Sequence, residues 1–349
     1  MSSDSPRKFI LASRASELAQ IQTNITRDAL QAKFPSIAFE TSFMTTGGDH
    51  NQSQALYLLG GKSLWTKELE VALKEGVVDM LVHSYKDVPT TLPDGCEIAG
   101  VLEREDPVDS LVVRKDLHWK TLEELPDGSV VGTSSVRRVA QLKRIFPKLV
   151  FRDVRGNLNT RISKLDAPDS PYVALILAKA GLLRLGWKAR ISSDISPPTL
   201  YHAVSQGALA IEIRADDAEA REFCRSITHW QTEWRCAAER ACLRVLEGGC
   251  SVPVGVSTEL VEKDGQQAGT LKISGCVTAL TGDPHYLLGL DEEVNSLKDA
   301  EAVGAKLARA LYGTGAKEVL EDINQDREKR IGEAKTTEEK EKIEAAIAA

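Results

Sequence analysis

The sequence predicts an α/β protein, because apolar runs of strand length alternate with stretches of helical periodicity along most of the chain. Helical stretches separate the apolar runs 9–13, 38–44 and 77–84. A β-α-β-α-β order favours a largely parallel sheet. In the first helical stretch, Leu18, Ile21, Ile25 and Leu30 lie roughly on one face, which we expect to be buried. The length of 349 residues leaves room for two or three domains.

The same alternation begins again after Pro126, which indicates a second α/β unit. We expect its strands at 128–134, 148–154, 172–178 and 208–214. A third unit from about Trp230 begins with a helix and contains two expected strands, 252–258 and 270–279. The first two units open alike: Ser13-Arg14 and Ser134-Ser135 each stand six residues before an Ala-Gln pair. Chance explains this similarity equally well.

The composition is that of a globular protein without a secretory or membrane segment. The apolar run near the N-terminus spans only 9–12, and no stretch reaches the roughly 18 apolar residues of a membrane span. The six cysteines form no CxxC pair and no zinc-spaced set with histidines. We therefore expect a soluble cytoplasmic protein with reduced cysteines, no bound metal and no membrane partner.

One basic segment stands out in an acidic chain. The net charge is −7, yet residues 131–165 contain nine lysines or arginines and one acid, Asp153. The overall charge disfavours nucleic acid as a partner. The segment is either a solvated helix face or a local cradle for an anionic ligand.

Hydroxyls and arginines gather where expected strands end. Ser134 and Ser135 precede a helix, and Arg137 and Arg138 stand in its first turn, where cations oppose the helix dipole unless an anion binds. The alternative is that both arginines point into solvent. Further candidates at strand ends are Arg14, Arg152, Arg155, Arg161, Lys179 and Arg184. Ligands of α/β sheets bind at the carboxyl ends of strands, and arginine binds carboxylates with two parallel hydrogen bonds. The pattern predicts a ligand with several carboxylates or phosphates.

Two further motifs suggest chemistry. Lys86-Asp87, after the apolar strand and before Pro89, is a typical place for an acid–base carboxylate, although a turn aspartate is the plain alternative. Gly248-Gly249 leaves the sulfur of Cys250 accessible, although a buried structural cysteine is the commoner case. The phosphate-binding and dinucleotide-binding glycine patterns are absent, which disfavours ATP and NAD enzymes.

Taken together, the motifs resemble the porphobilinogen deaminase (hydroxymethylbilane synthase) family, with a fungal character. The resemblance covers nearly the whole chain. Its segments are 11–19, 45–49, 60–70, 82–90, 103–112, 131–144, 154–166, 176–186, 203–214 and 239–255. Departures from the usual pattern are Tyr85, where Met or Leu is usual, Leu58, where bacterial members often have Lys, and the tail beyond about residue 328.

The resemblance implies two periplasmic-binding-protein-like α/β domains that flank a cleft, and a smaller C-terminal α/β domain. We expect domain 1 at 1–104 and 208–228, domain 2 at 105–207, and domain 3 at 229–349. It also implies a monomer that joins four porphobilinogens on a dipyrromethane cofactor, with loss of ammonia, and then releases hydroxymethylbilane by hydrolysis in haem biosynthesis. A non-enzymatic anion-binding protein of the same fold is the main alternative.

The resemblance also implies site residues. Asp87 would be catalytic, stabilising the cationic azafulvene and guiding proton transfers. Dipyrromethane would be joined to Cys250 by a thioether. The other cofactor-binding positions would be Ser84, Lys86, Asp87, Thr133, Ser134, Ser135, Arg137, Arg138 and Arg155. The substrate-binding positions would be Arg14, Lys62, Arg161 and Arg184.

Overall fold

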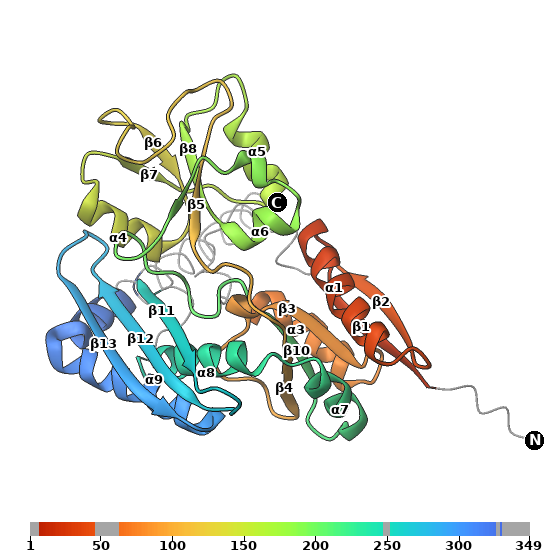
Figure 1. Cartoon of the computed structure of the whole chain (residues 1–349). Coiled ribbons are helices and arrows are strands. Elements are labelled where there is room, and N and C mark those ends of the chain that lie inside the picture. The colour runs from red at the N-terminus through yellow and green to blue at the C-terminus, as the bar shows by residue number, and fades with distance from the viewer. Residues whose placement is uncertain (1–6, 46–62, 247–251, 326–328, 330–349) are drawn as a thin grey trace, which may run out of the picture.

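The computed structural model describes residues 7–45, 63–246, 252–325 and 329, which form three α/β units around a common centre (Figure 1). Each unit has its own sheet. The predicted α/β class is confirmed. None of the described helices is long and apolar enough to cross a membrane.

The first sheet has the strand order β2-β1-β3-β10-β4. β1 pairs in parallel with β2 and β3, whereas β10 is antiparallel to both β3 and β4. Its strands are β1 (Lys8–Arg14), β2 (Ala38–Met44), β3 (Met80–Ser84), β4 (Cys96–Val101) and β10 (Leu209–Arg214). Helices cover both faces: α1 (Glu17–Lys33) and α7 (Ala218–Ser226) on one, and α3 (Ser63–Lys74) on the other.

The predicted buried face of α1 is only partly confirmed, since Leu30 is buried in the core of the first unit. Ile25 is exposed, and the buried residues include Gln22, Thr23 and Thr26. Thr23 donates to the Ser13 hydroxyl and Thr26 to the backbone oxygen of Gln22, so these polar groups are satisfied where they are buried. Hydrogen bonding to β1 and along the helix therefore outweighs the apolar periodicity.

The second sheet repeats the order of the first, as β7-β6-β8-β5-β9. Again three strands are parallel, and the fourth, β5, is antiparallel. Its strands are β5 (Asp109–Val113), β6 (Val130–Gly132), β7 (Val150–Arg152), β8 (Ala174–Ala178) and β9 (Ser193–Ile195). α4 (Val136–Ile145) packs on one face, and α5 (Leu158–Leu165) and α6 (Lys179–Arg184) pack on the other. In both sheets the strand-to-helix steps of the similar openings, β1–α1 and β6–α4, occupy equivalent places, as expected of two periplasmic-binding-protein-like units.

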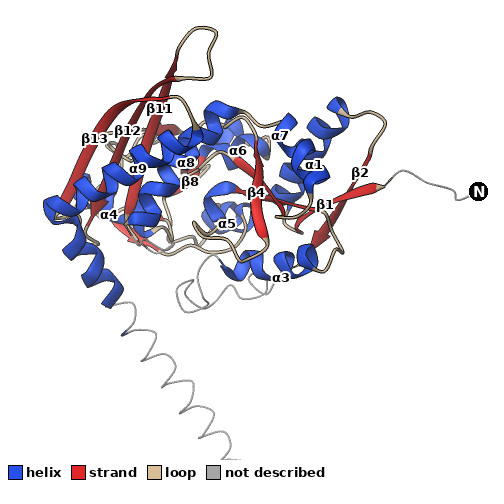
Figure 2. Cartoon of the chain, turned by 90° about the horizontal axis from the view of Figure 1, so that it is seen from below, coloured by secondary structure: helices blue, strands red, loops and turns tan. Residues whose placement is uncertain are grey.

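The third unit is an antiparallel three-stranded sheet, β11-β12-β13, with two helices packed on one face (Figure 2). Its elements are α8 (Trp230–Val245), β11 (Val254–Glu262), β12 (Gly269–Thr278), β13 (His285–Val294) and α9 (Leu297–Leu311). β13 was not predicted. It is an edge strand whose side chains before Val294 are partly or fully exposed. Its acidic residues interrupt the apolar run from which a strand would be predicted.

One buried ion pair ties the three units together. The chain crosses between the first two sheets at 102–108 and 196–208. On the first crossing, Arg104 donates from Nη1 to Oε1 of Glu239 in α8 at 2.6 Å and from Nη2 to Oε2 at 2.9 Å. On the second crossing, the backbone N–H of Ser205 donates to the same carboxylate at 2.7 Å, and the backbone oxygen of Gln206 accepts from Arg104 Nε. Burial alone would raise the pKa of Glu239, but Arg104 outweighs it and lowers the pKa to about 2.

We predict that Glu239→Gln lowers stability by about 3–5 kcal/mol, because it leaves the Arg104 guanidinium buried without its counter-charge. The stability from Glu239 should be complete above pH 4.5, its pKa in the unfolded chain, and should be lost as the pH falls towards 2. Urea unfolding midpoints at pH 7 and pH 3 measure both effects. Glu301→Gln is the matched control, since its pair with Arg244 is exposed. Equal midpoints for the two variants at pH 7 would contradict the assignment.

Candidate functional site

Three predicted site residues lie where the parallel strands of the first sheet end. Arg14 closes β1, Ser84 closes β3, and Asp87 ends the one-turn 3-10 helix η1 (Tyr85–Asp87) that follows. All three line one small cavity of about 80 Å³, together with Gln22 and His83. The carboxyl ends of parallel strands are where α/β sheets bind their ligands.

Gln22 is a residue of this cavity that the sequence analysis missed. Its side chain is buried, and Nε2 donates to the Ser84 hydroxyl at 2.9 Å. The available signal was a glutamine on the first helix, two turns after Arg14. The apolar residues beside it predict a different buried face.

Lys86 connects the first unit to the second. Its ammonium donates to Oε1 of Gln206 at 3.2 Å, and Gln206 in turn donates from Nε2 to Asp109 at 2.9 Å. Burial lowers the pKa of Lys86 to about 8, an effect that the neighbouring Asp87 partly opposes. A bound anion would favour the charged form of this lysine.

Arg137 and Arg138 are buried in the first turn of α4 and share one counter-ion, Asp109 at the start of β5. Arg137 Nη2 and Arg138 Nη2 each donate to a different oxygen of Asp109 at 2.7 Å. Burial alone would raise the pKa of Asp109, but the two guanidinium groups hold it well below its usual range. Two cations and one anion leave the cluster with a net positive charge. The alternative that both arginines point into solvent is wrong, since each is less than a tenth exposed.

Three other predicted arginines are half-buried and have no acidic partner in the part of the chain that the structure describes. Among the described residues, Arg155, Arg161 and Arg184 form no ion pair. Arg161 Nε donates to the backbone oxygen of Gly156, and Arg184 Nη2 donates to that of Gly207. Burial lowers the pKa of both guanidinium groups to about 10. Nη1 of Arg155 is buried and has no hydrogen-bond partner among the described residues. Such groups are costly unless an anion compensates them.

The two sheet units contribute to one site. The negative charge of Asp87, from the first unit, is among the charges that act on Arg161 in the second. Arg138, also from the second unit, acts on Lys86 in the first. These charge interactions bring Arg138 and Arg161 of the second unit near Lys86 and Asp87 of the first.

The predicted hydroxyl ligands mainly hold the turn between β6 and α4. Ser134 Oγ donates to the backbone oxygen of Val154 at 2.6 Å, and Thr133 Oγ1 accepts from the N–H of Ser135 at 3.3 Å. Ser135 is the N-cap of α4, yet its side chain makes no capping hydrogen bond. The oxygens of Thr133 and Ser134 thus bond to backbone groups of the turn, whereas the Ser135 hydroxyl makes no capping bond to the helix.

Two predicted residues, Lys62 and Cys250, lie outside the described residues. α8 leads towards Cys250, with Leu246 as its C-cap. Within the part of the chain that the structure describes, no cluster of His, Cys, Asp and Glu could hold a metal ion.

Known proteins give the same assignment over nearly the whole chain. The family model "Porphobilinogen deaminase, dipyromethane cofactor binding domain" matches residues 9–222, and "Porphobilinogen deaminase, C-terminal domain" matches 234–313.

Curated relatives come from both cyanobacteria and yeasts. The porphobilinogen deaminase of Synechococcus elongatus is 48% identical over 93% of this chain and 98% of its own. Those of Yarrowia lipolytica and Saccharomyces cerevisiae are 44% and 43% identical over 92% of this chain, and over 95% and 99% of their own. A solved substrate-binding domain of a putative amino acid transporter from Streptococcus pneumoniae is far more distant, with 13% identity over 68% of this chain and 94% of its own, at a TM-score of 0.40. On its sequence matches, the chain belongs to the porphobilinogen deaminase family.

Proposed function

We propose that this chain is a transferase that joins four porphobilinogen molecules head to tail, releases ammonia at each step and then hydrolyses the product to hydroxymethylbilane. The observation that carries the proposal is that Arg161, which has no acidic partner among the described residues, lies within reach of the charge of Asp87 from the other sheet unit. Each porphobilinogen carries two carboxylates, so the growing chain is a polyanion. We also propose that the protein works as a monomer in the cytoplasm.

The described residues fit a dipyrromethane cofactor, which the matched family model names. Its carboxylates would supply partners for two buried groups that have none among the described residues, Nη1 of Arg155 and Nε of Arg138. The Arg137–Arg138–Asp109 cluster has a net positive charge, which the carboxylates of the cofactor would also compensate. When bound, this group supplies the pyrrole carbon to which the first substrate is joined. We propose Cys250 as its covalent anchor.

The basic residues would bind and orient the substrate. Planar guanidinium groups hold carboxylates with two parallel hydrogen bonds, which fixes the plane of each pyrrole as well as its position. Arg161 and Arg184 would hold incoming substrate, together with Arg14 and Lys62. Arg137, Arg138 and Arg155, with Lys86 and the hydroxyls of Ser84, Thr133, Ser134 and Ser135, would hold the cofactor.

Asp87 would perform the proton transfers. When the substrate loses ammonia, its methylene carbon and ring nitrogen share a positive charge, and a carboxylate beside them lowers the energy of that state. The same carboxylate oxygens can first accept a hydrogen bond from the protonated amine and later take up a proton that the new bond releases. A binding protein of the same fold would need the arginines but not this carboxylate.

We predict that the denatured intact protein, purified from cells that make porphobilinogen, is heavier than its sequence by two linked pyrrole units. Cys250→Ala should have the mass of the chain alone, whereas the control Cys96→Ala should keep the added mass. An active wild-type preparation with an unmodified mass would refute the covalent anchor and favour the binding-protein alternative.

We predict that Asp87→Asn lowers kcat by about 10²–10⁴, the usual loss for a missing acid–base group. The side chain keeps its size, so substrate affinity should change much less. Asp94→Asn, an exposed aspartate in the loop that follows, is the control. Steady-state kinetics would exclude Asp87 from the reaction if the two variants turned over equally fast.

We predict that the lysine at position 86 limits activity at alkaline pH. Burial lowers its pKa to about 8 and bound carboxylates would shift it back upwards, so the anion-binding charge is present below pH 8 and is lost only at a higher, alkaline pH. Arginine stays charged, so the ratio of kcat/KM of Lys86→Arg to that of wild type should rise above about pH 8. Taking this ratio removes the titration of the substrate itself. A ratio that stays constant from neutral to alkaline pH would contradict the role.

A further inference from the structure

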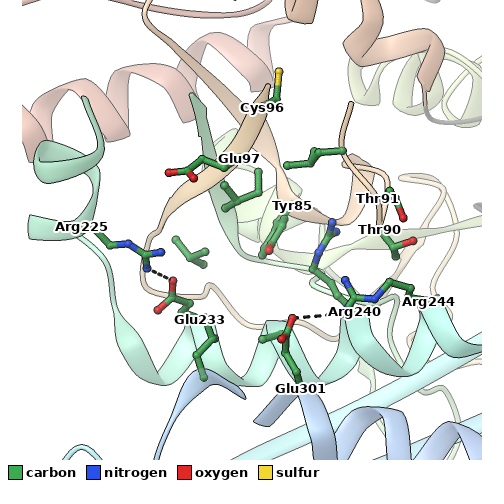
Figure 3. Close-up of a pocket in the computed structure, with 15 residues that line it drawn as sticks. Tyr85, Thr90, Thr91, Cys96, Glu97, Arg225, Glu233, Arg240, Arg244 and Glu301 are labelled. Carbon is green, nitrogen blue, oxygen red and sulfur yellow. Dashed lines mark hydrogen bonds and ion pairs between the residues drawn. The ribbon is translucent and has the colours of Figure 1, made fainter. Parts of the chain in front are cut away.

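An arginine of the third unit donates hydrogen bonds to the turn that carries Asp87. Arg240 in α8 is 7% exposed and donates from Nη1 to the backbone oxygen of Val88 at 3.1 Å and from Nη2 to that of Pro89. Its guanidinium carbon lies 4.4 Å from the centre of the Tyr85 ring. Figure 3 shows the two side chains next to each other. One guanidinium thus holds both sides of a five-residue turn, Tyr85 to Pro89, with Asp87 at its middle.

This contact is specific in geometry. Two carbonyls of consecutive residues accept from the two ends of one planar fork, an arrangement that a lysine ammonium cannot reproduce. In the described part of the chain Arg240 has no carboxylate partner, so carbonyl dipoles and the face of an aromatic ring stabilise its charge. The neighbouring Arg225 and Arg244 differ, because each pairs with a glutamate.

The other side of the turn is held by its own unit. The Tyr85 N–H donates to the backbone oxygen of Ala208, and the Val88 N–H donates to that of Tyr85. Tyr85 and Val88 are buried in one small cluster with Cys236 of α8. Removal of the Arg240 contacts therefore frees the carbonyl side of the turn while the strand side stays attached.

Tyr85 faces away from the cavity of Asp87. It lines a separate cavity of about 480 Å³ between the first and third units, together with Arg240, Arg244 and Glu301. A change at Tyr85 or Arg240 reaches the substrate site only through the backbone of the turn.

We propose that Arg240, with Tyr85, is a positioning residue that sets where the Asp87 carboxylate lies relative to the third unit. The inference rests on the proposed function, in which α8 also leads to the anchor Cys250. Because Glu239 holds the two crossings and Arg240 holds the turn, adjacent residues of one helix fix the carboxylate and the three units together. A displacement of about 1 Å at a reacting group costs roughly 10²-fold in rate.

Kinetics of four variants test the proposal. We expect Arg240→Gln to lower kcat by roughly 10–100-fold, with a much smaller change in KM. Arg240→Lys should lie between it and wild type, because it keeps a cation over the ring but loses the fork. Tyr85→Leu should have a smaller effect than Arg240→Gln, because the carbonyl contacts remain. Arg244→Gln is the matched control, one turn further along α8 in an exposed pair, and should match wild type.

A double-variant cycle separates positioning from general destabilisation. If Arg240 acts through Asp87, then Arg240→Gln should lower kcat little further in an Asp87→Asn background. If it only stabilises the fold, the two losses in kcat should multiply, and that result would overturn the proposal. Intact mass checks that each variant still carries the covalent cofactor.

Amide hydrogen exchange gives a readout independent of activity. Peptides that cover residues 84–91 should exchange faster in Arg240→Gln and Arg240→Lys than in wild type. In Arg244→Gln the exchange rate of these peptides should equal that of wild type. Unchanged exchange in both Arg240 variants would overturn the inference. If wild type itself made no hydroxymethylbilane, the proposed function would fail, while the exchange result would still decide whether Arg240 holds the turn.

Discussion

Half-buried guanidinium groups without carboxylate partners are the constraint on which the rest of this structure depends. The second unit contains Arg155, Arg161 and Arg184, and among the described residues Arg161 and Arg184 donate to backbone oxygens rather than to carboxylates. Burial lowers the pKa of Arg161 and Arg184 to about 10, which expresses the cost of keeping them charged there. Asp109 offsets part of the charge of Arg137 and Arg138, and the remainder favours an anion.

Each of the three units would contribute different residues to such a site. In the proposed function, the second unit binds the carboxylates of the pyrroles, the first contributes Asp87, and the third carries the anchor for the growing chain. These tasks succeed only if the units keep their relative positions. Two neighbouring residues of α8 help to fix these positions. The buried carboxylate of Glu239 accepts hydrogen bonds from both crossings, and Arg240 donates to the turn that carries Asp87. The buried polar contacts therefore specify an arrangement as well as stabilising it.

The sequence predicted what depends on local pattern. The alternation of apolar runs and helices identified β1, β2, β3 and most of the second sheet, because buried parallel strands read as continuous apolar stretches. The strand-end pattern and the family resemblance both selected the arginines and Asp87 as candidate site residues. β13 was missed because an exposed edge strand carries acidic residues, and the buried face of α1 was misjudged because polar side chains there find partners in β1.

The contacts that the sequence could not reveal all join distant parts of the chain. Asp109 meets arginines almost thirty positions later, and Arg240 meets a turn that precedes it by about 150 residues. No spacing rule connects such residues, since their meeting depends on how the sheets and α8 pack. Tyr85 was recognised only as a departure from the usual pattern. The contact with Arg240 explains what an aromatic ring contributes at that position, because the ring of Tyr85 stabilises the buried guanidinium.

The most direct measurement of the central claim is the thermal stability of the protein with and without covalently held carboxylates. If these groups compensate the buried arginines, wild type carrying its cofactor should unfold at a clearly higher temperature than Cys250→Ala. Replacing Arg155 with Gln should reduce that difference, because one of the charges to be compensated is gone. Equal unfolding temperatures for the loaded wild type and Cys250→Ala would contradict the account.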